Sequence, residues 1–199
     1  MMEQKKKAKI AVLVSGGGTN LQALIDAQSS GVLQSGEIRV VITANPRAYA
    51  LERAAKAGIE ALVLPRSGFE EALEASLLER EIDLIILAGF MLILSESFTS
   101  RWPRRILNVH PALIPSLCGQ GFYGLKVHEA ALERGVKVTG ATVHFVNEIP
   151  DGGEIILQKA VEVLAGDTPE ILQRRVMEQA EWILLPQAAE LVAKGVINT

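Results

Sequence analysis

The side chains of this sequence that could do chemistry together are an amide, an imidazole and a carboxylate. Asn108 and His110 belong to the run Asn108-Val109-His110-Pro111, and Asp151 opens the sequence Asp151-Gly152-Gly153. An amide and a protonated imidazole stabilise the oxyanion that forms when a carbonyl carbon is attacked. A carboxylate beside them can orient the imidazole and move a proton. The combination predicts acyl-group transfer.

Each of these residues also has a purely structural interpretation. Asn108 could cap a loop, His110 could be a packed core histidine, and a turn aspartate such as Asp151 is usually a local cap. Residues i and i+2 of an extended strand point to the same side, so we expect Asn108 and His110 to share one face. We also expect a carboxylate beside His110 to raise its pKa and keep the ring protonated.

A glycine turn, Ser15-Gly16-Gly17-Gly18-Thr19-Asn20, joins a β-branched run to a segment of helical periodicity. Free backbone N–H groups and the helix dipole attract anions at such a helix start, and Thr19 and Asn20 add side-chain donors. Leu21 stands where a dinucleotide fingerprint has a third small residue, and the P-loop lysine is absent. The turn therefore predicts a site for a single phosphate, with a ligand-free turn as the alternative.

The elements that must position these side chains predict an α/β fold. Strands alternate with helices in the first half, which is typical of a parallel sheet with right-handed crossovers. We expect a Rossmann-like, mostly parallel sheet there, then an antiparallel strand pair and a long helix in the C-terminal part. The predicted strands are 10–14, 38–43, 61–64, 84–88, 106–109, 138–147 and 154–163. The predicted helices are 21–31, 47–57, 69–80 and 168–194, the last kinked or split at Pro186.

Length and charge narrow the class of protein. A chain of 199 residues predicts one domain, or one domain with a small lobe. A net charge of −3 disfavours a nucleic-acid partner. No stretch reaches the roughly 18 apolar residues of a membrane span, and no signal peptide precedes the first strand, so we expect a cytoplasmic protein. The polar start, Met1 to Lys9, is interpreted as a frayed lead-in rather than as a polyanion-binding arm.

The cysteine and histidine content predicts no metal site. Cys118 is the single cysteine, which excludes an internal disulfide, and it is interpreted as a bystander thiol with a nucleophile as the alternative. The histidines at 110, 128 and 144 lack the close spacing of zinc ligands. His128 falls in a helical stretch, and we expect it to have a surface or a structural role. His144 lies in a strand, and whether it faces the site is left open.

With these residues assembled, the chain resembles the phosphoribosylglycinamide formyltransferases, the folate-dependent enzymes of purine synthesis. The resemblance runs nearly end to end and rests on ordered segments at 14–23, 87–91, 108–115, 140–146, 151–153 and 155–158. It implies one formyltransferase domain, 1–199. That domain would have a nucleotide-binding half at about 10–109 and a folate-binding, catalytic half at about 110–199.

The resemblance also implies an activity and a role for each candidate residue. The formyl group of 10-formyltetrahydrofolate, a co-substrate, would pass to the amine of glycinamide ribonucleotide. Asn108, His110 and Asp151 would be catalytic, with His144 in support. The residues implied to bind the nucleotide are Gly18, Thr19, Asn20 and Glu181. Of these, Glu181 would bind the amine of the nucleotide. The residues implied to bind the folate are Arg66, Met91, Leu92, Ile93, Leu94 and Asn108. We expect no metal, nucleic acid or membrane partner, and a monomer or a weak homodimer.

The chain departs from the family pattern at a few positions. Leu92 stands where arginine is frequent, Asn147 where an acidic residue is frequent, and Glu154 where proline is usual. Trp182 follows Glu181 where histidine is common, and the loop from Cys118 to Gly124 is a glycine-rich variant.

Other functions compete with this interpretation. Known 10-formyltetrahydrofolate hydrolases have a similar core but add an N-terminal regulatory domain, whereas the first strand here begins near residue 10. Methionyl-tRNA formylation uses a similar core with an added C-terminal RNA-binding domain, whereas this chain ends after its closing helix. A non-enzymatic module for a phosphorylated metabolite would keep the glycine turn and give the catalytic trio no role.

Overall fold

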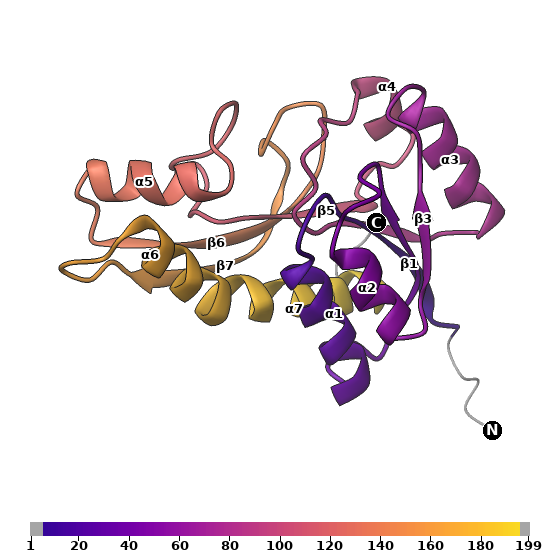
Figure 1. Cartoon of the computed structure of the whole chain (residues 1–199), viewed down its shortest axis with the longest axis horizontal. Coiled ribbons are helices and arrows are strands. Elements are labelled where there is room, and N and C mark those ends of the chain that lie inside the picture. The colour runs from indigo at the N-terminus through magenta and orange to yellow at the C-terminus, as the bar shows by residue number, and fades with distance from the viewer. Residues whose placement is uncertain (1–5, 196–199) are drawn as a thin grey trace.

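The computed structural model of the protein describes residues 6–195, so part of the predicted lead-in lies outside the described residues. One seven-stranded sheet runs through the molecule, and helices pack on both of its faces (Figure 1). The strands are β1 (Ala8–Leu13), β2 (Gly36–Thr43), β3 (Glu60–Val63), β4 (Leu84–Leu87), β5 (Ile106–His110), β6 (Val138–Phe145) and β7 (Ile155–Glu162). The helices are α1 (Thr19–Ser30), α2 (Ala50–Lys56), α3 (Phe69–Glu79), α4 (Glu96–Thr99), α5 (Leu125–Glu133), α6 (Pro169–Val176) and α7 (Trp182–Ala193).

The strand order β3-β2-β1-β4-β5-β6-β7 confirms the predicted fold class. Strands β1 to β5 pair in parallel, whereas β6 pairs antiparallel with β5 and β7 antiparallel with β6. From β1 the chain adds β2 and β3 on one side, and it then crosses over to add β4 and β5 on the other side of β1. In open parallel sheets this switch point leaves a crevice at the carboxyl ends of the strands, where ligands bind.

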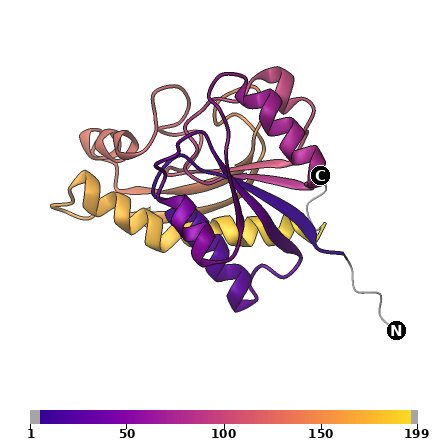
Figure 2. The ribbon, with the colours of Figure 1, turned by 45° about the vertical axis from the view of Figure 1, so that its right-hand side comes forward.

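Alternation along β1 explains how the sheet holds two helical layers. Ile10 and Val12 belong to one buried apolar cluster, with side chains of α1, α2, α5, α6 and α7, and Ala11 and Leu13 belong to another, with side chains of α3 and α4. Period-two alternation places neighbouring residues on opposite faces. Every residue of β4 is buried, as the uniformly apolar run predicts. Figure 2 shows the helices on either side of the twisted sheet.

The closing helix is where the sequence prediction and the structure differ most. Thr168 caps α6 by accepting a hydrogen bond from the N–H of Ile171, with Pro169 at the helix start, as predicted. The interruption, however, is a π-helical turn at Met177–Glu181, and α7 continues through Pro186. The prediction of a split at Pro186 is therefore wrong. Single π turns within helices are frequent at functional sites.

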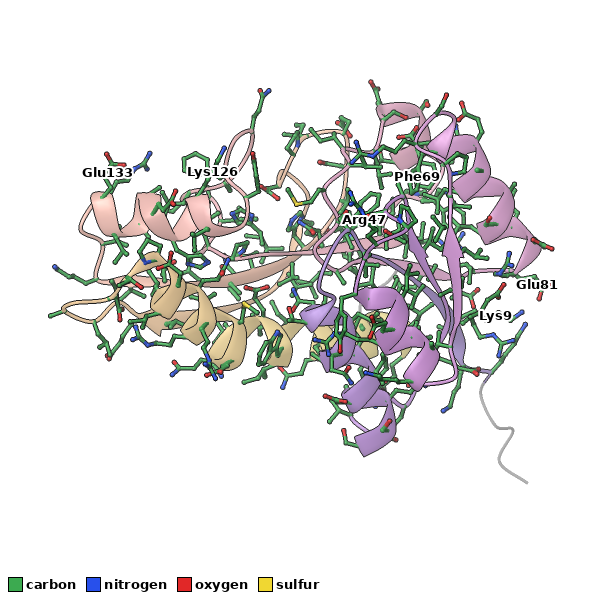
Figure 3. The ribbon with its side chains drawn as sticks, in the orientation of Figure 1. Lys9, Arg47, Phe69, Glu81, Lys126 and Glu133 are labelled. Atoms are coloured by element: carbon green, nitrogen blue, oxygen red, sulfur yellow. The ribbon has the colours of Figure 1, made fainter. Side chains whose placement is uncertain are left out.

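Smaller differences lie in the helices. The predicted helix at 47–57 begins only at Ala50, and the short α4 has no counterpart in the prediction. No helix within residues 6–195 has the length and apolar character needed to cross a bilayer. Lys9 and Glu81 form an ion pair at the amino ends of β1 and β4, on the right-hand side of Figure 3.

Adjacent leucines of α3 provide a matched test of this core. Leu77 is fully buried, whereas Leu78 is 65% exposed. Leu77→Ala should lower the free energy of unfolding by about 2–5 kcal/mol, because it removes buried methyl groups and leaves a cavity. Leu78→Ala should change it by no more than about 0.5 kcal/mol. Urea unfolding of both variants measures the difference, and equal losses would contradict the assigned face of α3.

Candidate active site

The chemical residues meet in a cavity of about 570 Å³ at the carboxyl ends of the central strands. Its walls come from the segments that follow β4 and β5, from the loop before α5, from the turn before β7 and from the π turn. The predicted site residues that line it are Asn20, Met91, Leu92, Ile93, Asn108, His110, Asp151 and Glu181. The cavity thus lies at the switch point of the sheet, where a ligand is expected.

Asp151 brings the predicted trio together. One carboxylate oxygen, Oδ2, lies 3.5 Å from Nδ1 of His110 and accepts a 2.9 Å hydrogen bond from the backbone N–H of Gly119. The other, Oδ1, lies 3.5 Å from Nδ2 of Asn108 and 3.5 Å from Nε2 of His144. Asn108 and His110 therefore share one face of β5, as the i, i+2 spacing predicts, and the open question about His144 is settled because its ring faces the site.

Backbone carbonyls fix the proton positions of both rings when they are neutral. Nε2 of His110 lies 2.8 Å from the carbonyl oxygen of Leu117, and Nδ1 of His144 lies 2.7 Å from that of Phe145. A carbonyl oxygen only accepts, so these nitrogens carry the protons. Nε2 of neutral His144 is then an acceptor, and Nδ2 of Asn108 donates to it at 3.2 Å. The second N–H of this amide points to Oδ1 of Asp151 at 3.5 Å, so the two contacts together orient Asn108.

The turn that carries Asp151 depends on its glycines. Asp151 itself has a left-handed backbone, with φ of 56°. A Cβ on Gly153 would lie 1.7 Å from the carbonyl oxygen of Phe145, and one on Gly152 would lie 2.6 Å from the Ile149 side chain. The turn can therefore press against the end of β6 only because these positions lack side chains.

Burial and charge act in opposite directions on the titrating pair. Burial lowers the pKa of His110 below its ordinary value of 6.5, although the Asp151 carboxylate and the Leu117 carbonyl act to raise it. The expectation that Asp151 keeps His110 protonated is therefore wrong, because desolvation of the 4% exposed ring is the larger effect. Burial also raises the pKa of Asp151, but its contacts with His144, His110 and the Gly119 N–H outweigh this and leave the pKa lowered.

Glu181 joins the end of the cavity to the glycine turn. Its side chain lies in the π turn, is 7% exposed and accepts a 2.9 Å hydrogen bond from Nδ2 of Asn20. Burial raises the pKa of Glu181 to about 7, and the bond from Asn20 opposes this only in part. Oδ1 of Asn20 is buried and has no hydrogen-bond partner among the described residues. The pair thus presents an unsatisfied acceptor and a carboxyl group that titrates near neutral pH.

Other predicted residues lie beside the cavity rather than in its lining. Gly18 is the N-cap of α1, with a left-handed backbone, and Thr19 faces a different groove on the far side of that helix. Arg66 is exposed and lines a separate hollow of about 350 Å³ with Leu94. That hollow shares Leu92 and Ile93 with the main cavity, so the two adjoin at these residues.

Sequence reasoning missed two parts of the wall. His128 is fully buried in α5 and lines the cavity, so the structure excludes a surface role and agrees with the structural role that was its alternative. Neither ring nitrogen has a hydrogen-bond partner among residues 6–195, and burial lowers its pKa to about 4. Gln173 and Met177 also line the cavity, from α6 and the π turn. A single histidine on a helix carries no spacing signal, so only the tertiary arrangement could find it.

Two departures from the family pattern have structural consequences. Glu154, where proline is usual, forms an ion pair with Arg104, whose guanidinium lies 4.5 Å above the Phe145 ring. The backbone carbonyl of Glu154 also accepts a hydrogen bond from Phe145. Cys118 bonds to the Pro115 carbonyl, and burial raises the pKa of its thiol. A raised pKa favours the bystander interpretation of Cys118, because the thiolate is the nucleophilic form.

The buried carboxyl predicts a pH-dependent cost to stability. The unfolded chain ionises Glu181 near its ordinary pKa of 4.5, and the folded protein does so only near 7. The folded state therefore binds more protons in this window, and stability should fall as the pH rises from about 4.5 to about 7. Glu181→Gln should remove this loss. The difference in free energy of unfolding between the variant and wild type should therefore grow, in favour of the variant, by up to about 3 kcal/mol between pH 5 and pH 8.

Urea unfolding at the two pH values measures this gain. Glu178→Gln, in the same π turn but exposed, is the control and should leave the pH dependence of wild type unchanged. If wild type and Glu181→Gln show parallel pH dependence, Glu181 does not titrate as a buried acid.

Comparisons with known proteins agree with this architecture. Residues 8–188 match the sequence model of the formyl transferase family. The chain is 42% identical to the phosphoribosylglycinamide formyltransferase of Haemophilus influenzae, over 94% of this chain and 88% of that protein. A solved structure, glycinamide ribonucleotide transformylase 1 from Symbiobacterium toebii, superposes with a TM-score of 0.90 at 43% identity, covering 98% of this chain and 92% of that one.

One relative is a much longer protein, and nearly all of this chain matches one part of it. The identity with the trifunctional purine biosynthetic protein adenosine-3 of Homo sapiens is 46%, over 98% of this chain but 19% of that protein. The chain thus spans about a fifth of that relative's length. From the family model, the near full-length bacterial relatives and the shared fold, we conclude that the chain belongs to the formyl transferase family, among the phosphoribosylglycinamide formyltransferases.

Proposed function

We propose that this protein transfers the formyl group of 10-formyltetrahydrofolate to the amine of glycinamide ribonucleotide, a step of purine biosynthesis. The observation that carries the proposal is the convergence of Asn108, His110 and Asp151 on one wall of the cavity. Membership of the family supports the choice of substrates, because relatives that match nearly end to end are named for this activity.

The nucleotide occupies the part of the cavity next to α1 in this proposal. Its phosphate lies on the backbone N–H groups after Gly18, where the helix dipole is favourable and Gly18 has no capping side chain to compete. Gly18, Thr19 and Asn20 form that anion site, and Glu181 holds the substrate end nearer to the trio. The folate lies against Met91, Leu92, Ile93 and Leu94, with Arg66 at the outer hollow. The nucleotide contacts in this proposal come from both predicted halves of the domain, 10–109 and 110–199, whereas the folate contacts come from 10–109.

Formyl transfer requires one bond to form, one to break and one proton to move. The substrate amine attacks the formyl carbon, and Asn108 donates to the oxyanion that develops with the N–H that otherwise makes the long, 3.5 Å contact with Asp151. His110 starts neutral, so the His110–Asp151 pair can accept the proton that the new ammonium must lose. The growing negative charge of the oxyanion favours the imidazolium and offsets the effect of burial. The same pair returns the proton to the folate nitrogen as the carbon–nitrogen bond breaks.

Folate absorbance gives a direct test of the proposal. The protein is incubated with 10-formyltetrahydrofolate, with and without glycinamide ribonucleotide. Turnover that requires the nucleotide is expected. Turnover without the nucleotide would indicate a hydrolase, and no turnover with it would favour a binding module, so either result would contradict the proposal.

His110→Ala should lower kcat by about 10²-fold or more, because it removes the group that takes the proton and supports the developing charge. The dissociation constant for the nucleotide should change little, since the phosphate lies at the distant glycine turn. Steady-state kinetics and calorimetric binding measure the two quantities. The control variant is Glu148→Ala, in the exposed turn outside the cavity, which should leave kcat unchanged. An unchanged kcat for His110→Ala would remove this residue from the mechanism.

A further inference from the structure

A second hollow of similar size lies on the opposite side of the glycine turn. It has a volume of about 520 Å³ and runs between α1 and α7, which pack side by side (Figures 1 and 2). We call it the α1–α7 groove. It shares no lining residue with the catalytic cavity, and none of the residues assigned to catalysis or folate binding contributes to it.

One face of α1 forms the floor of the groove. Its lining residues recur at intervals of three and four from Thr19 to Ser30, which is the spacing of a single helical stripe. Ala23 and Ala27 on this stripe are small and leave open space. The twelve residues from Thr19 to Ser30 span about 16 Å, so the groove is long enough for a sugar and an aromatic base placed end to end.

The facing wall comes from α7 and contains one aromatic ring. Trp182 and Pro186 of α7 line the groove, and the indole Nε1 of Trp182 has no hydrogen-bond partner among the described residues. An indole across the groove from two alanines favours a planar ring over a flexible chain, because stacking stabilises a base by about 1–3 kcal/mol.

The end of the groove next to the glycine turn is electropositive. Arg53 lines it and is held there by a 2.8 Å hydrogen bond from Nε to the Gly17 carbonyl and a 3.0 Å bond from Nη1 to Gln22. The N-terminus of α1, with Thr19 as its first residue, adds the positive end of the helix dipole. Asp26, farther along, is negative, so an anionic group is attracted to the turn and repelled from the middle of the groove.

We propose that the α1–α7 groove binds the base of a nucleoside monophosphate whose phosphate occupies the glycine turn. The sugar then lies along the stripe of α1 and the base lies between the alanines and Trp182. The turn suits one phosphate rather than two, which selects a monophosphate. The proposal rests on the proposed function in one respect, since the same turn is assigned there to the substrate phosphate.

Competition with the substrate follows from this geometry. Consecutive residues of α1 face different hollows, with Thr19 on the groove and Asn20 on the catalytic cavity, and the same is true of Trp182 and Glu181. The Asn20–Glu181 hydrogen bond therefore separates the two. One turn cannot hold two phosphates, so a nucleoside monophosphate excludes glycinamide ribonucleotide without entering the catalytic cavity.

Calorimetric titration of the whole protein tests the base contact without any assay of activity. The probes are AMP, ribose 5-phosphate and inorganic phosphate. AMP should bind at least about tenfold more tightly than ribose 5-phosphate, as stacking of about 1.4 kcal/mol or more requires. Equal affinities would mean that only the turn is used and would overturn the proposal.

Substitutions inside the groove locate the base. Trp182→His and Ala23→Phe should each weaken AMP binding about tenfold or more and leave ribose 5-phosphate binding unchanged. Ala75→Phe makes the same change on the exposed face of α3 and should affect neither ligand. Unchanged AMP affinity in both groove variants would place the base elsewhere and refute the proposal.

Sedimentation velocity and kinetics complete the test. A wild-type dimer that Ala23→Phe dissociates would show that a second copy covers the groove, which would also refute the proposal. AMP should inhibit formyl transfer competitively against the nucleotide. If transfer is absent while AMP still binds in the groove, the proposed function fails and the groove assignment stands.

Discussion

The candidate site depends on one carboxylate. Asp151 lies in the turn before β7. Its carboxylate contacts Asn108 and His110 of β5, His144 of β6 and the backbone N–H of Gly119 in the loop before α5. Residue 151 follows β5 by some forty positions, so the fold must return the chain to the same sheet edge. The antiparallel strands β6 and β7 do this, and the glycine at 153 lets the turn press against Phe145. A larger residue at 153 would push the carboxylate away from both histidines.

Buried charge gives the cavity its chemical asymmetry. Burial lowers the pKa of His110 and raises that of Glu181, because desolvation penalises the charged form of each. Asp151 is the exception, since its polar contacts outweigh the same penalty. At neutral pH the free protein therefore has an uncharged imidazole beside a charged carboxylate. Such a pair is poised to take up a proton when negative charge develops nearby, whereas an imidazolium already formed could not.

Much of this arrangement is readable from the sequence, and the exceptions share a cause. Alternating apolar segments predict the parallel sheet, and the position of Asn108 and His110 at a strand end predicts where the site lies. Local patterns cannot report the protonation of His110, because desolvation depends on every neighbour in space. They also cannot place His128, whose helix is buried against segments distant along the chain. The π turn escapes prediction for the same reason, since packing sets its geometry, whereas Pro186 is tolerated inside α7.

The first turn of α1 is the element on which both hollows depend. Its dipole and free N–H groups attract an anion regardless of what is attached to it. Specificity must therefore come from the surface that meets the rest of the ligand, and this chain has two such surfaces. The catalytic side presents the buried polar groups of Asn20 and Glu181, whereas the groove side presents Trp182 and small residues of α1, with Arg53 at the end next to the turn. A ligand that shares only its phosphate with the substrate is thus distinguished by its other end. The Asn20–Glu181 bond keeps the two ends apart, because it links α1 to the π turn between the two hollows.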